Sequence, residues 1–309
     1  MRLSTGIVAP RDAADPSGYR ADMGWGRTRL TPEQREAVRR VLPDAEVVAD
    51  ESWGLLDTVV LHVRAAGSEW TVKASGPDNT HFPRELEAHR GWTAALVAHG
   101  DAGRLRAADE TARVLVLERV PGRLALGTPD EHDPAVHRQA GQLLRRLHDQ
   151  ASRPDATWLE RERAKTTGLL DHPHGIPADR VDRLRTLLAH HPVGPVVLVP
   201  THGDWQARNW IVDDGRLRAI DFGRFAFRPA MTDCTRVAVQ HWRHEPALER
   251  VFTDGYGGDP RTADAWRWLQ LREAIGTAVW AHAVGDRRFE QQGNDMLADA
   301  LAAFTDDRW

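Results

Sequence analysis

Several features that would direct a chain to a membrane or an oxidising compartment are missing from this sequence. Its 309 residues include one cysteine, Cys234, which forbids an internal disulfide and fits a reducing cytoplasm. No apolar run approaches the ~20 residues of a membrane-spanning helix, and residues 1–6 lead into no apolar signal-peptide core. We therefore expect a cytoplasmic protein with no membrane partner.

An excess of positive charge is also missing, because the formal net charge is −4 at pH 7. Nucleic-acid-binding domains usually carry a basic surface, so we expect no nucleic-acid partner. Hydrophobic residues make up 41% of the chain and charged residues 28%, which is ordinary for a folded globular protein. A chain of this length can bury a core large enough for two lobes.

Lysine is almost absent, since the 41 basic residues comprise 39 arginines and only Lys73 and Lys165. Lys165 lies in a charged helical pattern, where a solvated lysine needs no special reason. Lys73 follows Trp70 and Val72 in an apolar strand pattern, and alternation places it on the opposite face. A compact ammonium on a thin stem serves where a bulky guanidinium does not fit, so Lys73 is a candidate for binding a ligand. A solvent-facing lysine on an edge strand is the alternative.

The strongest functional pattern is residues 201–209, Thr-His-Gly-Asp-Trp-Gln-Ala-Arg-Asn, followed by residues 220–223, Ile-Asp-Phe-Gly. Asn209 follows Asp204 by five residues, and Asp221 opens a literal D-F-G. In the protein-kinase template an Asp at the first position orients the acceptor hydroxyl, while the Asn and the second Asp hold Mg²⁺. The spacing therefore predicts phosphoryl transfer.

The residues between the two motifs give a geometric reason for the spacing. Short, mostly apolar runs at 210–212 and 217–220 flank Asp-Asp-Gly at 213–215, a hairpin turn signal. A hairpin brings its ends together, so Asn209 and Asp221 are expected at the same end. Amide and carboxylate oxygens suit Mg²⁺, a hard cation. A structural hairpin with turn-favouring Asp and Asn is the alternative.

With these residues in view, H-G-D-x-x-x-x-N followed by I-D-F-G resembles the aminoglycoside phosphotransferase and choline kinase group of small-molecule kinases. Three further stretches resemble the family's helix ending in Leu-His, its hinge between lobes and the segment after the metal-binding Asp: residues 140–148, 115–122 and 229–233. The resemblance covers roughly residues 53–233. The resemblance is weak outside this range, and the C-terminal segment is where such enzymes usually select their substrate.

The resemblance implies an α+β, two-lobed protein-kinase-like fold with a β-rich N-terminal lobe and a mainly helical C-terminal lobe. We expect the nucleotide-binding lobe at residues 1–118, beginning with an arm of about 30 residues, and the catalytic and substrate-binding lobe at residues 119–309. The loop at residues 51–57 would cover the phosphates, although it contains one glycine rather than the G-x-G-x-x-G of protein kinases.

The resemblance also implies a nucleotide between the lobes, ATP or, as the alternative, GTP. Lys73 would bind its α- and β-phosphates. Glu85 is the expected partner of this lysine, with Glu87 as the alternative. Backbone groups near Glu118 and Val120 would hold the adenine edge.

The remaining roles fall to the two motifs. Asn209 and Asp221 would hold Mg²⁺, and Asp204 would orient and deprotonate the acceptor hydroxyl. His202 would shape the loop that presents Asp204. A module that only binds nucleotide does not need all of these residues, so a pseudokinase is the rival from another class.

The acceptor is expected to be a small hydroxylated molecule, an antibiotic or related natural product, with a housekeeping kinase of choline, homoserine or a sugar as the alternative. Residues 224–309 contain 13 acidic residues against 11 arginines, which is too balanced for a typical polycation site and favours a neutral or weakly charged acceptor. Four tryptophans of this region either stack on the acceptor or pack in the core: Trp242, Trp266, Trp268 and Trp280.

Overall fold

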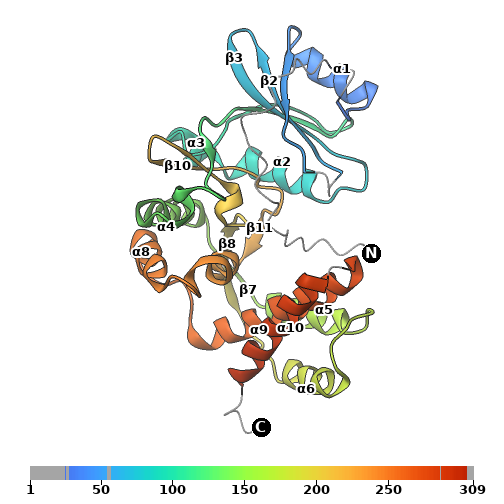
Figure 1. Cartoon of the computed structure of the whole chain (residues 1–309), viewed down its shortest axis with the longest axis vertical. Helices are drawn as coiled ribbons and strands as arrows, with labels where there is room; N and C mark the ends of the chain where they lie inside the picture. Colours follow the sequence, from blue (N-terminus) through green and yellow to red (C-terminus); the bar gives the residue numbers. More distant parts are fainter. Residues whose placement is uncertain (1–24, 26–27, 54–56, 286, 305–309) are drawn as a thin grey trace.

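The computed structural model describes residue 25 and residues 28–53, 57–285 and 287–304. An antiparallel sheet with its helices forms the N-terminal part, and a larger, mainly helical part follows it (Figure 1). Within the described ranges, no helix combines the length and apolar character needed to cross a bilayer. Most of the predicted N-terminal arm, and residues 54–56 of the predicted phosphate loop, lie outside these ranges.

The N-terminal sheet has five strands in the order β1-β2-β3-β5-β4. Its strands are β1 (Glu46–Asp50), β2 (Val59–Ala65), β3 (Ser68–Ala74), β4 (Leu105–Asp109) and β5 (Val114–Glu118). The prediction of a β-rich N-terminal lobe is confirmed. Between β3 and β4 lie α2 (His81–Gly91) and α3 (Ala94–Ala98).

Side-chain alternation divides the sheet into two apolar faces. Val72, Val114 and Val116 belong to a core that helix α1 (Pro32–Val41) completes. Leu115 and Leu117 point to the other face and pack against α2. Because Lys73 pairs across the sheet with Leu115, it lies on the α2 face, as the strand pattern predicts.

The predicted hairpin is present as β9 (Trp210–Asp213) and β10 (Arg216–Ala219), paired antiparallel. Its two-residue turn consists of Asp214 and Gly215, with φ of 49° and 71°. Positive φ at both positions is the signature of a type I′ turn, whose twist matches the paired strands. The hairpin pairs with β6 (Arg123–Leu124), the first element after the N-terminal sheet.

Helices predominate in the rest of the chain, as the sequence predicts. A second small sheet, not predicted, has the order β11-β8-β7 and joins distant short strands. The elements after residue 125 are η2 (Pro129–His132), α4 (Pro134–His148), β7 (Arg153–Asp155), α5 (Trp158–Leu169), α6 (Ala178–Ala189), β8 (Val196–Thr201), η3 (Ala207–Asn209), β11 (Ala226–Arg228), η4 (Ala230–Asp233), α7 (Cys234–Val237), η5 (Ala238–Trp242), α8 (Pro246–Tyr256), α9 (Ala263–Val284) and α10 (Arg287–Ala302), besides the hairpin.

Two apolar clusters organise this part. The first lies around the catalytic motifs and includes Trp205, Trp210 and Phe222, all buried, together with side chains of α4 and α8. The second joins α6, α9 and α10 and contains Trp268, which therefore packs in the core rather than in a binding site.

Helices α4 and α8 approach each other through glycine. A Cβ atom on Gly141 would lie 2.2 Å from the carbonyl oxygen of Phe252, and one on Gly255 would lie 2.1 Å from that of Arg138. Contacts this short cannot be relieved by a side-chain rotation, because the obstructing atoms belong to the backbone. The two glycines therefore set the distance between these helices.

We predict that Gly141→Ala lowers the free energy of unfolding by roughly 1–3 kcal/mol, as overpacking does, because α4 and α8 must separate. The matched control is Gly276→Ala in α9, where the nearest atom would lie 4.0 Å away, in ordinary contact. There alanine should be neutral or stabilising by up to about 1 kcal/mol. Urea denaturation of both variants measures this, and equal effects would contradict the packing argument.

Candidate active site

The loop that carries Asp204 starts at the end of β8 and requires a glycine. Gly203 has a φ of 82°, and a Cβ atom there would lie 2.1 Å from the carbonyl oxygen of Arg224. His202 lies within hydrogen-bonding distance of the carbonyl of Ile220, 3.0 Å away, which ties the loop to the end of the hairpin. The predicted structural role of His202 therefore agrees with its contacts.

A buried carboxylate that the sequence did not single out anchors this loop. Asp233 accepts hydrogen bonds from the backbone N–H groups of His202 at 2.8 Å and Gly203 at 2.6 Å. The Nε2 of His148 lies 3.0 Å from the same carboxylate. Burial acts to raise the pKa of Asp233, but the contacts with His148, His202 and the backbone of Gly203 together outweigh burial and the pKa is lowered.

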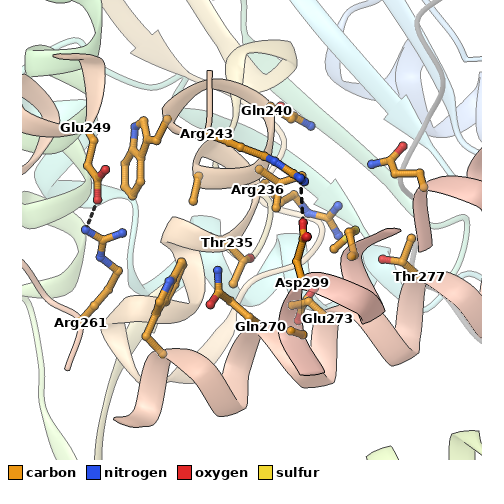
Figure 2. A pocket seen from close by; sticks show the side chains of 17 residues that line it. Thr235, Arg236, Gln240, Arg243, Glu249, Arg261, Gln270, Glu273, Thr277 and Asp299 are labelled. Carbon is orange, nitrogen blue, oxygen red and sulfur yellow. Dashed lines mark hydrogen bonds and ion pairs between the residues drawn. The ribbon is translucent and has the colours of Figure 1, made fainter. Parts of the chain in front are cut away.

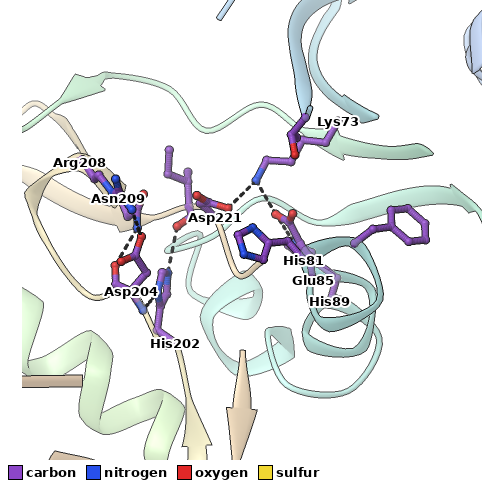
Figure 3. Close-up of polar contacts among 12 residues, drawn as sticks. Lys73, His81, Glu85, His89, His202, Asp204, Arg208, Asn209 and Asp221 are labelled. Carbon is purple, nitrogen blue, oxygen red and sulfur yellow. Dashed lines mark hydrogen bonds and ion pairs between the residues drawn. The ribbon is translucent and has the colours of Figure 1, made fainter. Parts of the chain in front are cut away.

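The carboxylate of Asp204 is 2% exposed, and donors occupy both of its oxygens. Figure 3 shows Arg208 and Asn209 beside it. Oδ1 accepts a hydrogen bond from Gln206 at 2.7 Å and forms an ion pair with Arg236 at 2.8 Å. Oδ2 accepts hydrogen bonds from Arg208 at 2.6 Å and Asn209 at 2.9 Å. Asp204 is therefore held in one orientation.

The charge of Asp204 is set by competing effects. Burial acts to raise the pKa of this carboxyl, but Arg236, Arg208 and Arg224 together outweigh burial and the pKa is lowered. Asp204 is consequently an ionised hydrogen-bond acceptor at neutral pH.

The hairpin brings Asn209 and Asp221 to one end, as predicted. Ile220 N–H donates to the carbonyl of Asn209 at 3.0 Å, beyond the last strand pair, Trp210 and Ala219. Both amide hydrogens of Asn209 point to Asp204, because Nδ2 donates to its backbone carbonyl at 2.7 Å and to its carboxylate. The side-chain oxygen of Asn209 is thereby turned away from Asp204.

Lys73 joins the sheet, α2 and the hairpin (Figure 3). Its Nζ lies 2.6 Å from a carboxylate oxygen of Glu85 and 3.0 Å from one of Asp221. Lys73 and Glu85 are 12% and 6% exposed in their side chains, whereas Asp221 is 47% exposed and so remains accessible from the cleft. Glu87 is exposed on the other side of α2, which settles the choice of lysine partner in favour of Glu85.

These three groups are strongly coupled. Burial acts to lower the pKa of Lys73, but Asp221 and Glu85 outweigh it and raise the pKa above its ordinary value. Burial also acts to raise the pKa of Asp221, which Lys73 reverses, so that Asp221 stays ionised. Burial raises the pKa of Glu85 in spite of the nearby lysine. The ammonium is thus charged at any physiological pH.

A cavity of about 100 Å³ lies between the sheet and the hairpin. Its wall contains Lys73, Glu85, Glu118, Val120 and Asp221, so the structure brings together the predicted phosphate lysine, its partner, both predicted hinge residues and one predicted metal ligand.

A second cavity, of about 400 Å³, lies in the helical part, between α7 and η5 on one side and α9 and α10 on the other (Figure 2). Trp242 and Trp266 line it, as does Arg236, whose guanidinium also contacts Asp204. Arg236 could not be identified from the sequence, because its contact with Asp204 depends on the fold.

Solved structures of small-molecule kinases share the fold of this chain. Macrolide 2′-phosphotransferase MphH from Brachybacterium faecium matches with a TM-score of 0.57 at 17% identity, over 90% of this chain and 98% of that one. A choline/ethanolamine kinase family protein from Mesorhizobium loti matches with a TM-score of 0.59 at 19% identity, over 88% and 95%. Aminoglycoside phosphotransferase APH(4)-Ia, as a thermostable mutant with ADP and hygromycin B, matches with a TM-score of 0.62 at 13% identity, over 90% and 100%. The fold is therefore the α+β protein-kinase-like fold.

The amino-acid sequence also matches a known protein family. Residues 52–271, well over half of the chain, match the family described as "Phosphotransferase enzyme family". The chain belongs to this family and is a small-molecule phosphotransferase. Comparison with curated proteins gives no match.

We predict that Asp233→Asn lowers the free energy of unfolding by roughly 1.5–3 kcal/mol, because an amide cannot accept from two backbone N–H groups and a histidine as a carboxylate does. The control is Asp254→Asn, whose side chain is 64% exposed and lies 3.5 Å from Arg138. That change should stay within about 0.5 kcal/mol. Urea denaturation measures both, and an Asp233→Asn protein as stable as the control would contradict the anchoring role.

Proposed function

We propose that this enzyme transfers the γ-phosphoryl group of ATP, with Mg²⁺, to a hydroxyl of a small molecule, and that its acceptor is an antibiotic or related natural product. The observation that carries the proposal is the position of the two motif carboxylates between two cavities. Asp221 lines the smaller cavity, and Asp204 contacts Arg236 in the wall of the larger one. Nucleotide and acceptor can then meet at the end of the hairpin.

The smaller cavity is the proposed nucleotide site. Lys73 binds the α- and β-phosphates as a point charge that Glu85 keeps in place. Backbone groups of Glu118 and Val120 hold the base edge of ATP, with GTP as the alternative. In this proposal residues 1–118 are the nucleotide-binding lobe and residues 119–309 the catalytic and acceptor-binding lobe, acting in the cytoplasm where ATP is abundant.

The donor chemistry at the hairpin fits Mg²⁺. Asn209 presents an amide oxygen, since its N–H groups are used by Asp204, and Asp221 presents an accessible, ionised carboxylate. The described residues include no cluster of three or more His, Cys, Asp or Glu side chains that could hold a metal by itself. Mg²⁺ usually takes one or two protein ligands together with nucleotide phosphates and water, so Asn209 and Asp221 would be sufficient. When bound, the metal neutralises charge on the phosphates.

Asp204 accepts the hydrogen bond of the acceptor hydroxyl and takes its proton as the phosphoryl group transfers. Its lowered pKa suits orientation more than strong basicity, which agrees with phosphoryl transfer, where positioning and electrostatics dominate. Support for an antibiotic acceptor comes from the similarity of the fold to macrolide and aminoglycoside phosphotransferases. A metabolite kinase is the second candidate, because choline kinase structures match equally well.

The test is a screen of hydroxylated antibiotics and metabolites with ATP and Mg²⁺, read by mass for a gain of phosphate. We predict that Asp204→Asn lowers turnover by roughly 10²–10⁴-fold, the usual contribution of a positioned base, with nucleotide affinity nearly unchanged. Turnover within threefold of the unmutated enzyme would remove Asp204 from the mechanism. Full activity in the presence of a chelator would refute the role of Mg²⁺.

We further predict that Lys73→Arg lowers turnover by roughly 10²-fold, because the wider guanidinium displaces the phosphates by about 1 Å. Lys165→Arg, at an exposed position of α5, is the matched control and should change neither turnover nor thermal midpoint. Near-neutral behaviour of both variants would show that Lys73 is not the phosphate lysine.

A further inference from the structure

The acceptor hydroxyl cannot reach Asp204 unless one of the present partners of the carboxylate moves. Each carboxylate oxygen already has two partners, Gln206 and Arg236 on Oδ1 and Arg208 and Asn209 on Oδ2. The partner that leaves, and what receives it afterwards, therefore constrains the chemistry of the acceptor. This reasoning rests on the proposed function, because it assumes that the acceptor occupies the larger cavity.

Three of the four partners of Asp204 are held in place by a further contact. Asn209 also donates to the backbone carbonyl of Asp204 at 2.7 Å. Gln206 is held by Gln240, which donates to it at 2.6 Å. Arg208 packs over Trp53, a residue of the predicted phosphate loop, 5.6 Å from its ring centre.

Arg236 differs from these three because its side chain lines the larger cavity (Figure 2) and meets Asp204 through Nε as an ion pair. It is the partner of Asp204 that an acceptor entering from that cavity reaches first. The side chain of Arg236 is 10% exposed, so a guanidinium that released Asp204 would need another negative partner nearby.

The cavity wall offers no free carboxylate among the described residues. Glu249 pairs with Arg261, and Asp299 pairs with Arg243 at 2.7 Å. Glu273 pairs with Arg272 at 3.1 Å and is shared with Arg236 and Arg224, which also act to lower its pKa against the effect of burial. Arg224 adds a further positive charge close to Arg236, since burial and Arg236 lower the pKa of Arg224 to about 10. A polycationic acceptor could bind the carboxylates of this wall only by breaking their ion pairs. An anionic acceptor could instead form a new ion pair with Arg236.

We propose that the acceptor carries an anionic group, a carboxylate or a phosphate, near the hydroxyl that is phosphorylated, and that Arg236 leaves Asp204 to bind it. Trp242 and Trp266, with Arg261 stacked 4.9 and 5.0 Å from their rings, form the far wall for the apolar or planar part of the acceptor. Departure of Arg236 also frees one position on Oδ1 for the acceptor hydroxyl.

This proposal refines the expectation of a neutral or weakly charged acceptor. The count of charges in residues 224–309 is balanced, but the fold places arginine rather than a free acid beside the catalytic carboxylate. The charge expected for the acceptor therefore follows from the residues around Asp204 rather than from the charge count of the whole segment.

A binding experiment tests the proposal without requiring turnover. The full chain, saturated with Mg²⁺ and a non-hydrolysable ATP analogue, is titrated calorimetrically with four related compounds: gluconate, glucose 6-phosphate, glucose and glucosamine. At least one anion should bind roughly 10-fold more tightly than glucose and glucosamine, the contribution of one charged hydrogen bond. The two anions separate a carboxylate from a phosphate preference.

Variants test whether Arg236 is the source of the preference for anions. Arg236→Gln should abolish it, Arg236→Lys should retain part of it, and the exposed Arg250→Gln in α8 should leave it unchanged. Thermal midpoints confirm that each variant is folded. No saturable anion binding, equal binding of the four compounds, or an anion preference that survives Arg236→Gln would overturn the proposal.

Kinetics separate this proposal from the proposed function. With an acceptor from the mass screen, Arg236→Gln should raise the KM for the acceptor and leave the KM for ATP unchanged. Efficient transfer to neutral or cationic acceptors alone would overturn the anion proposal while the phosphotransferase function stands. Turnover that survives Asp204→Asn would refute the proposed mechanism, whatever the anion titrations show.

Discussion

The contact of Lys73 with Asp221 is the interaction on which the active site depends, because it joins two segments 148 residues apart in the sequence. Lys73 comes from the central strand of the N-terminal sheet, and Asp221 follows the hairpin embedded in the helical part. Glu85 completes the contact from α2. A charge buried to this extent is tolerated only when it is paired, so the three elements must keep a fixed mutual position. This fixed position leaves the small cavity between the sheet and the hairpin.

A second buried charge fixes the other half of the site. Asp233 holds the backbone of His202 and Gly203, and this loop presents Asp204 to its four partners. The N-terminal anchor sets where phosphates can lie, and the C-terminal anchor sets where an acceptor hydroxyl can lie. The motif spacing is informative because Asn209 and Asp221 flank a hairpin whose two-residue turn sets the pairing of its strands.

The sequence predicted those parts of the site that depend on local geometry. Asp214-Gly215 specifies a type I′ turn by its own backbone preferences, and this turn places Asn209 and Asp221 together. Strand alternation predicted that Lys73 lies on the opposite face of the strand from Trp70 and Val72, and the family resemblance limited its partner to Glu85 or Glu87. Choosing between these two required the orientation of α2 on the sheet, which packing with Leu115 and Leu117 determines. Asp233 and Arg236 could not be found in this way, because their roles arise from contacts about 30 residues away in sequence.

The scarcity of lysine has a practical consequence for chemical labelling. The chain offers amine-directed reagents only two side-chain targets, and these differ sharply in environment. Lys165 is exposed on a helix, whereas the Lys73 ammonium is enclosed by two carboxylates that hold its proton. Acylation requires the unprotonated amine, so modification of Lys73 proceeds only in molecules where Asp221 and Glu85 have released it. The ratio of labelling at the two lysines thus reports, in unmutated protein, how often Lys73 is released from Asp221 and Glu85.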